Sequence, residues 1–523
     1  MQPGGPFTIP AINNFIPEKI KPWILILFVL IIQFSSGGIY LATLNQVVGD
    51  QALMQEDVLM AGYAALVGMA LTFTIMLRLK MRFLSKTTFM VCCSVLIAAN
   101  IICMYTQNVF ILVATCFIAG VFRMWATFEC NSSIQLWITP TRDLSVFFCY
   151  IYIIVQGAIL LGGSTHLYVT MLSTWQYVHW LMIGGLLFIM LMVSLIFNSQ
   201  RFMRAFPLFG IDWLGMFLWG LILLCINFIA IYGEFYDWFD AWQIQIACTF
   251  LIVLLLLNLY RATFIRHPFI GLAVFKYKIV YLSVLVYFAV DLLIAPSHLI
   301  EEIYTHAILQ YDEMHSIQLN LMSFLAVVMA CIFSYFYFAK AKKSYKSTFM
   351  IGFMAIILYL LMMYLMLDYQ TSFEVLAISI MFRNFGYVVI SIVLLTGLTK
   401  VPFPHFFQAL TIQMMMSAAC GTAITGAILH HMFSHSLTEN FQLLTMNMDR
   451  VNPQLWSYTS DQLAVMIPQH ALLETFKELY GVLVLISFVL LILFVCYRYP
   501  YLPVNVLYPK RKTIRKFLKK ETS

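Results

Sequence analysis

Long apolar runs, separated by short polar segments, cover most of the chain. The runs are continuous rather than alternating, which favours α-helices over the strands of a membrane β-barrel. About 20 apolar residues in a helix are enough to cross a bilayer. The pattern predicts fourteen membrane-spanning helices, over residues 23–44, 57–77, 87–105, 109–133, 144–166, 175–198, 213–232, 241–259, 278–300, 315–338, 348–367, 373–398, 406–432 and 475–497. The long connection is the polar segment 433–473.

Basic and acidic residues alternate between the predicted connections. Lys and Arg collect in the cytoplasmic loops of membrane proteins. With the N-terminus inside, the inner loops hold Arg78, Lys80, Arg82, Lys86, Arg142, Arg201, Arg204, Arg261, Arg266, Lys276, Lys278, Lys340, Lys342, Lys343, Lys346 and Lys400. The outer loops hold Asp50, Glu56, Asp57, Glu234, Asp237, Asp240, Asp312, Glu313, Asp368 and Glu374. An incorrect count would scramble this alternation, so the charges support fourteen helices with both termini in the cytoplasm.

The composition excludes a soluble protein. The 523 residues are 62% hydrophobic and 10% charged, whereas a soluble domain carries about 25% charged residues. The net charge of +7 reflects the sidedness above and the basic segment 498–523, which suits an anionic inner leaflet rather than nucleic acid. The eleven cysteines all fall in apolar runs, so we expect neither a disulfide framework nor a metal site.

The sequence contains no GxxxxGK[ST] phosphate loop and no catalytic motif such as GxSxG or HExxH. Each of these motifs supplies specific chemistry, a phosphate cradle, an exposed nucleophile or a zinc site. We therefore expect a protein that is not an enzyme, is not driven directly by ATP and needs no cofactor.

Four charged residues lie inside the predicted spans: Arg123 and Glu129 in the fourth, Asp291 in the ninth and Arg383 in the twelfth. A charge at bilayer depth costs at least about 2.5–3.5 kcal/mol, so such residues are paired, face a cavity or are functional. Arg123 and Arg383 are candidates for binding an anionic substrate or for ion pairs between helices. Glu129 is a candidate for a gate ion pair or for proton transfer.

Asp291 is the strongest candidate for proton coupling. His298 follows it by seven positions and Glu302 by eleven, so an unbroken helix places all three on one face. Together they would form a ladder for a proton, because burial favours the neutral form of a carboxyl group, which a proton carrier needs. The alternative is an ion pair of Asp291 with Arg383 or Arg123 that holds helices together.

Several glycines occur within the spans, and small residues let helices approach closely in a membrane. The candidates for helix packing are Gly157, Gly162, Gly163, Gly421 and Gly426. Packing or local bending is the simpler explanation of these positions than a direct role in transport.

Three segments in the middle of the chain carry a resemblance to a known family. Residues 211–215 read IDWLG, residues 237–239 DWF and residues 268–276 PFIGLAVFK. With the fourteen spans and the segment 433–473, they resemble the fourteen-helix branch of the major facilitator superfamily, the EmrB/QacA type of drug:proton antiporters. The family's signature motifs are degenerate here, because the loop 78–86 (RLKMRFLSK) has the basic charge without the family's Asp and glycines.

The resemblance implies two six-helix bundles, two extra helices between them and a central cavity that opens to each side of the membrane in turn. The expected segments are 1–22 (cytoplasmic tail), 23–198 (first bundle), 199–276 (extra helices), 277–497 (second bundle with the extracytoplasmic loop 433–473) and 498–523 (basic cytoplasmic tail). The resemblance also implies a basic gating loop with Arg78, Lys80, Arg82 and Lys86.

The function implied by the resemblance is proton-coupled export of small amphipathic compounds, of the multidrug efflux type, across a bacterial cytoplasmic (inner) membrane. The implied partners are a small-molecule substrate, the lipid bilayer and, in a tripartite pump, a membrane-fusion adaptor and an outer-membrane channel, with segment 433–473 as one adaptor contact. Two alternatives stay open. One is a dedicated exporter of an endogenous anionic compound such as a fatty acid, lipid or siderophore. The other is a non-transporting membrane scaffold or sensor.

Overall fold

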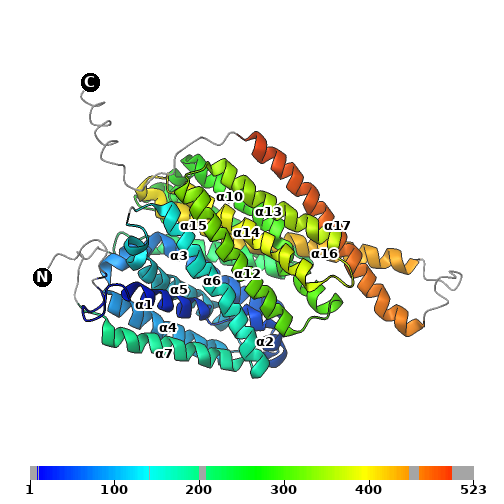
Figure 1. Cartoon of the computed structure of the whole chain (residues 1–523), viewed down its shortest axis with the longest axis horizontal. Coiled ribbons are helices and arrows are strands. Elements are labelled where there is room, and N and C mark those ends of the chain that lie inside the picture. The colour runs from blue at the N-terminus through cyan, green and yellow to red at the C-terminus, as the bar shows by residue number, and fades with distance from the viewer. Residues whose placement is uncertain (1–8, 10, 141, 200–207, 447–458, 498–523) are drawn as a thin grey trace.

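The computed structural model describes residues 9, 11–140, 142–199, 208–446 and 459–497, and these residues are almost entirely helical (Figure 1). Among them, thirteen helices are long and apolar enough to cross a membrane. A shorter apolar helix, α1 (Lys21–Phe34), lies where the first span is predicted. The prediction of an all-α, multi-pass membrane protein is confirmed.

The two halves of the chain form two groups of helices that lie side by side in Figure 1. The first half comprises α1, η1 (Leu41–Thr43), α2 (Leu44–Gln51), α3 (Gln55–Arg82), α4 (Ser85–Tyr105), α5 (Val109–Ile138), α6 (Leu144–Leu172) and α7 (Gln176–Ile196). The second half comprises α10 (Lys278–Ile294), η4 (Ala295–His298), α11 (Ile300–Ile303), η5 (Tyr304–Ile308), α12 (Glu313–Phe333), η6 (Ser334–Lys340), α13 (Tyr345–Met366), α14 (Phe373–Leu398), α15 (Phe403–Met414), η7 (Met415–Cys420), α16 (Gly421–Met446) and α17 (Ser460–Cys496). The two groups meet where α6 packs along α12 and α3 packs against α15 and η7.

Two further helices, α8 (Trp213–Tyr232) and α9 (Trp242–Phe264), connect the halves in sequence. α8 touches both groups: its Tyr232 hydroxyl bonds Asp57 on α3, and its Asn227 Nδ2 donates to the Ala419 carbonyl of η7 at 2.8 Å. α9 packs mainly on α8 and leaves large apolar side chains exposed, among them Ile246 and Leu256. An apolar surface of this kind suits contact with lipid.

A carboxylate ties the start of α8 to the end of α9. Asp212 caps α8 by accepting from the Gly215 amide at 2.9 Å. It also forms a two-pronged ion pair with Arg261 on α9 and accepts from the Phe269 amide at 3.1 Å. Burial alone would raise the pKa of Asp212, but these hydrogen bonds and the Arg261 charge outweigh burial and hold the pKa below its usual value.

We expect Asp212→Ala to lower the free energy of unfolding by about 2–3 kcal/mol, because hydrogen bonds to a charged group are strong and Arg261 loses its partner. Because the folded pKa is lowered, the contribution of the Asp212 charge is complete above about pH 4, the usual range of an aspartate, and is lost as the pH falls through the folded pKa. The free energy of unfolding of wild type and variants, measured in detergent between pH 3 and 7, tests this pH dependence. The stability difference between wild type and Asp212→Asn should shrink in acid, and a difference independent of pH would contradict the prediction.

Two pairs of helices touch backbone to backbone through glycines. Gly68 on α3 and Gly120 on α5 face each other's helices so closely that an added Cβ would collide with the carbonyl oxygens of Phe117 and Ala65. In the second half, an added Cβ on Gly386 of α14 would lie 2.5 Å from the carbonyl oxygen of Gly352 on α13. Small residues at such crossings let transmembrane helices approach closely.

Gly120→Ala should therefore destabilise the fold by about 1–3 kcal/mol or more, because the new methyl group meets rigid backbone rather than a flexible side chain. Gly184→Ala is the matched control, since a Cβ there meets nothing within 4 Å among the described residues. The measurement is the yield of monodisperse protein and its melting temperature in detergent. Equal behaviour of the two variants would show that the α3–α5 contact relaxes easily.

Within the predicted loop 433–473, the described residues on either side of 447–458 are almost all helical. α16 continues to Met446 and α17 begins at Ser460, and both project past the rest of the bundle (Figure 1). Polar contacts hold the two helices together, because Glu478 accepts from the Ser436 hydroxyl and from Asn440 Nδ2. Hydropathy locates only the membrane-buried part of such helices, so the sequence did not predict the helical structure of residues 433–446 and 460–473.

The predicted basic loop is also mostly helical. Arg78, Lys80 and Arg82 lie in the last turns of α3 and Lys86 in the first turn of α4, so Phe83 and Leu84 alone connect the two helices. The basic residues Arg201, Arg204 and Arg450, most of segment 1–10 and the tail 498–523 lie outside the described residues.

Candidate functional site

The first helix of each half is interrupted. α1 has 14 residues and is about 21 Å long, less than the roughly 30 Å of the hydrocarbon core. Residues 35–40 follow it without regular helix, and Gly37 and Gly38 have φ values of +90° and +102°, which favour glycine. In the second half, Pro296 lies in the 3-10 segment η4 that ends α10. In many membrane proteins built from two similar halves, interruptions at corresponding positions lie at a binding site, so we take the two breaks as the candidate site.

Asp291 lies on the last turn of α10, next to one of these interruptions. It is 1% exposed, and neither of its carboxyl oxygens has a hydrogen-bond partner among the described residues. It interacts electrostatically with Tyr63 on α3, Tyr152 on α6 and Tyr387 on α14. These tyrosines come from both halves, so the carboxyl group lies where the two halves meet.

The helix packed beside Asp291 changes its winding. η7 is a π-helical segment between α15 and α16, and Gly421 follows it directly. A Cβ on Gly421 would lie 3.2 Å from Asp291 Oδ2, so the absence of a side chain leaves room for the carboxyl group. Single π-helical turns occur frequently at functional sites.

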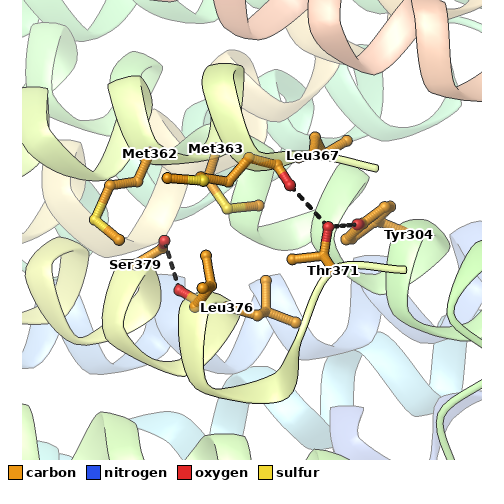
Figure 2. A pocket seen from close by; sticks show the side chains of 9 residues that line it. Tyr304, Met362, Met363, Leu367, Thr371, Leu376 and Ser379 are labelled. Carbon is orange, nitrogen blue, oxygen red and sulfur yellow. Dashed lines mark hydrogen bonds between the residues drawn. The ribbon is translucent and has the colours of Figure 1, made fainter. Parts of the chain in front are cut away.

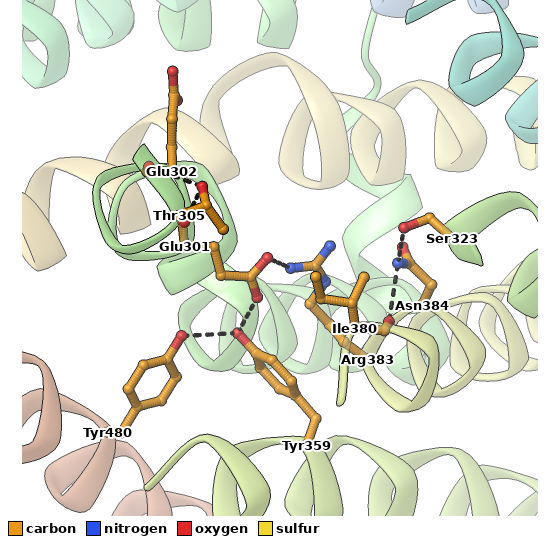
Figure 3. A network of polar contacts seen from close by, with 9 residues as sticks. All are labelled: Glu301, Glu302, Thr305, Ser323, Tyr359, Ile380, Arg383, Asn384 and Tyr480. Carbon is orange, nitrogen blue, oxygen red and sulfur yellow. Dashed lines mark hydrogen bonds and ion pairs between the residues drawn. The ribbon is translucent and has the colours of Figure 1, made fainter. Parts of the chain in front are cut away.

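A second carboxylate, Glu301 on α11, lies in a network of buried polar groups (Figure 3). It forms an ion pair with Arg383 on α14 and accepts from the Tyr359 hydroxyl at 2.7 Å. The Tyr480 hydroxyl of α17 lies 3.3 Å from that of Tyr359. The predicted alternative of an ion pair between Asp291 and Arg383 is therefore wrong, because Glu301 holds the arginine.

The structure corrects one residue of the predicted proton ladder of Asp291, His298 and Glu302. Glu302 is exposed and Glu301 is buried, and the side chain of His298 lies outside the described part of the chain. The four residues of η4 wind at about 120° per residue instead of about 100°. The added rotation of about 80° is close to one residue of α-helix, so Glu301 takes the inward position predicted for Glu302.

The two inward carboxylates face a polar stripe on α14. Arg383, Tyr387 and Ser391 are spaced by four residues and share one face of this helix. Arg383 pairs with Glu301, and Tyr387 interacts with Asp291 one turn further along the helix. The polar groups thus run from the break after α10 toward the middle of the molecule.

Arg123 on α5 has neutral partners. It is 4% exposed and its Nη2 donates to the backbone oxygen of Gln33 at 3.0 Å and to Gln33 Oε1 at 2.7 Å. Gln33 in turn donates to the Thr127 hydroxyl at 2.8 Å. The ion pair between Asp291 and Arg123 that the sequence left open is not formed.

A polar cluster missed by sequence reasoning surrounds the break after α1. The Tyr40 hydroxyl donates to Asn100 Oδ1 at 2.6 Å, and His179 Nδ1 lies 3.2 Å from the same oxygen. The His166 ring lies 4.5 Å from the Tyr40 ring between centroids. The signal that was available is the polar, glycine-containing stretch Ser35-Ser36-Gly37-Gly38 inside an apolar run.

Glu129 lies near the other end of α5, away from these clusters. Its carboxylate is 3.8 Å from Lys80 Nζ on α3 and accepts from the Ser85 hydroxyl at the start of α4 at 2.5 Å. The side chain is buried. These contacts form an ion pair between α3 and α5, and a role of Glu129 in gating or in proton transfer stays a prediction.

The candidate glycines divide into two groups. A Cβ on Gly157 would lie 2.9 Å from the Phe324 ring, and one on Gly162 would lie 3.2 Å from Phe34. Within the described residues, a Cβ on Gly163 or Gly426 meets nothing within 4 Å. At these two positions the structure shows room for a side chain, so of the two predicted roles local bending remains the better explanation.

A pocket of about 180 Å³, which includes open space at its mouth, lies between the end of α13 and the start of α14 (Figure 2). Its lining residues are Tyr304, Met362, Met363, Met366, Leu367, Thr371, Val375, Leu376 and Ser379. This pocket lies within one half of the molecule, so we place the candidate site at the polar groups between the halves.

No protein-family model and no curated protein sequence matches the chain. Solved structures do match. A peptide transporter POT in complex with sulfate aligns over 93% of this chain and 96% of its own, with a TM-score of 0.57 and 14% identity. The nucleoside transporter NupG aligns over 91% and 100%, with a TM-score of 0.51 and 12% identity. The inward-open xylose transporter XylE from E. coli aligns over 93% and 98%, with a TM-score of 0.51 and 12% identity. The chain is therefore a multi-pass α-helical membrane protein with the fold of the major facilitator transporters.

Proposed function

We propose that the protein is a secondary active transporter that couples the movement of a small amphipathic compound to protons. The observation that carries this proposal is Asp291, a carboxyl group whose two oxygens have no partner among the described residues and which lies between tyrosines of both halves. A buried carboxylate without a partner is strongly unfavourable, whereas a protonated carboxyl group is tolerated. A group in this position gains and loses a proton as the halves move.

Glu301 and Arg383 form the outer part of the proposed proton route. Arg383, which pairs with Glu301, lies on the same face of α14 as Tyr387, which interacts with Asp291. A proton that arrives from the predicted extracytoplasmic side would reach Glu301 first and then Asp291. Rocking of the two halves about the site, which the fold supports, would then expose substrate and carboxyl group to each side in turn.

In its full form the proposal is export of the multidrug efflux type across a bacterial cytoplasmic membrane, by a fourteen-helix transporter. The projecting part of α16 and α17 is then the surface that we assign to a periplasmic adaptor protein. Substrate-driven proton movement in proteoliposomes tests the proposal, and the design of that experiment opens the Discussion.

A further inference from the structure

The two halves carry polar clusters at the same four helix positions. In the first half, Tyr40 follows the broken first helix, and Asn100, Arg123 and His179 lie on the third, fourth and sixth helices. In the second half, Glu301 follows the broken first helix, and Tyr359, Arg383 and Tyr480 lie on the third, fourth and sixth. The hydrogen bonds repeat as well, because Tyr40 meets Asn100 as Glu301 meets Tyr359. The halves can therefore be compared group by group.

The comparison leaves one charge without a counterpart. In the second half the arginine of the fourth helix is neutralised by Glu301. In the first half the place of Glu301 is taken by the uncharged Tyr40, and Arg123 donates only to Gln33 in the described part of the chain. A buried guanidinium without an anion is costly to the fold.

Unsatisfied atoms accompany this charge. The Nε of Arg123 is buried and has no hydrogen-bond partner among the residues that the structure describes, and the same holds for Nε2 of His166, a residue that is 4% exposed. His166 hydrogen-bonds to the backbone of Phe34 at the end of α1 and lies within electrostatic range of Arg123. Buried polar atoms are almost always bonded to protein, water or a ligand. Two such atoms lie beside the interruption of α1.

We propose that Arg123, with His166 beside it, binds the carboxylate or phosphate group of an amphipathic monoanion at the break after α1. The anion supplies the negative charge that Glu301 supplies in the other half. An arginine suits this role because its guanidinium stays charged and binds planar oxyanions with two hydrogen bonds. This inference rests on the transport function proposed above and narrows its substrate class. The anion has two sources, a free organic carboxylate or the headgroup of an acidic lipid.

The first test needs no ligand. If the Arg123 charge is uncompensated, Arg123→Gln should raise the melting temperature of purified, ligand-free protein by about 2–4 °C. Arg383→Gln, the matched variant of the other half, should lower it, because Glu301 loses its partner. An unchanged or lowered melting temperature for Arg123→Gln would overturn the proposal, since Arg123 would then be a structural hydrogen-bond donor.

The second test uses wild-type protein in phosphatidylcholine nanodiscs and three probes with one ring system: 1-naphthaleneacetate, the neutral 1-naphthaleneacetamide and the cation 2-(1-naphthyl)ethylammonium. We expect the carboxylate alone to raise the melting temperature, and Arg123→Gln to lose that response while Arg123→Lys keeps part of it. Stabilisation by phosphatidylglycerol nanodiscs instead, again lost in Arg123→Gln, would assign the site to a lipid headgroup. Stabilisation by neither anion, or equally by all three probes, overturns the proposal. No gradient is present, so a failure of proton coupling leaves this result unaffected.

Discussion

Asp291→Asn should abolish substrate-driven proton movement while leaving the protein folded. The amide matches the carboxyl group in size but cannot exchange a proton. Purified wild type and variant are placed in proteoliposomes with an imposed pH gradient, and a trapped pH dye reports proton flux after addition of a substrate. The panel comprises lipophilic cations, bile acids, fatty acids and anionic antibiotics. We expect a signal from wild type and only the background of empty liposomes from Asp291→Asn.

Glu302→Gln is the control for this experiment. Glu302 is a carboxylate close in sequence but exposed, so its loss should leave the signal intact. A signal that survives in Asp291→Asn would place the proton carrier elsewhere, with Glu129 as the next candidate. If folded wild-type protein moves no protons with any compound of the panel, the result would contradict broad-specificity transport and favour a membrane scaffold.

Glu301→Gln and Arg383→Gln should each lower the free energy of unfolding by about 3–5 kcal/mol, because removing one partner of a buried ion pair leaves an uncompensated charge. The pair is nearly inaccessible, with side-chain exposures of 9% for Glu301 and 14% for Arg383. The double variant removes both charges and should lose much less than the sum. Thermal or detergent-induced unfolding of the four proteins gives a double-mutant cycle.

One outcome of the double-mutant cycle would contradict the predicted ion pair. Strictly additive losses would mean that the two side chains do not interact in the folded protein. Tyr359→Phe is a useful companion, because it removes only the hydroxyl that donates to Glu301 and should cost about 1–3 kcal/mol. A larger loss from Tyr359→Phe than from Arg383→Gln would show that the tyrosine rather than the arginine stabilises the carboxylate.

The sequence predicted the helical spans well, because a bilayer demands long apolar segments whatever their neighbours. It missed the break after α1, because Ser35 to Gly38 hardly change the average hydropathy of that run. The break depends on packing that no local pattern contains: Cβ atoms at Gly37 and Gly38 would lie 3.0 Å from Ala65 and 2.9 Å from Cys103. The outer parts of α16 and α17 were missed for the opposite reason, since a polar helix outside the lipid has no hydropathy signal.

The candidate site was predicted in part. The intramembrane charges Arg123, Glu129, Asp291 and Arg383 were identified from their cost in lipid, but their partners were not, because pairing depends on rotation and depth. Glu301 illustrates how strongly the rotation of a helix decides which residue faces inward. The 3-10 turns of η4 change the rotation by about 80°, which exchanges the inward and outward residues of the pair Glu301 and Glu302.

The position of α8 sets a mechanical condition on any rocking of the halves. The helix is fastened to α3 through Tyr232 and Asp57 and to η7 through Asn227 and Ala419. A hydrogen bond breaks when its donor and acceptor move apart by more than about 1 Å. If the two halves rock, one of these two hydrogen bonds of α8 must therefore break each time the halves move apart. The bond to a carboxylate is the stronger of the two. α8 should therefore travel with the first half and act as a latch that the second half engages and releases.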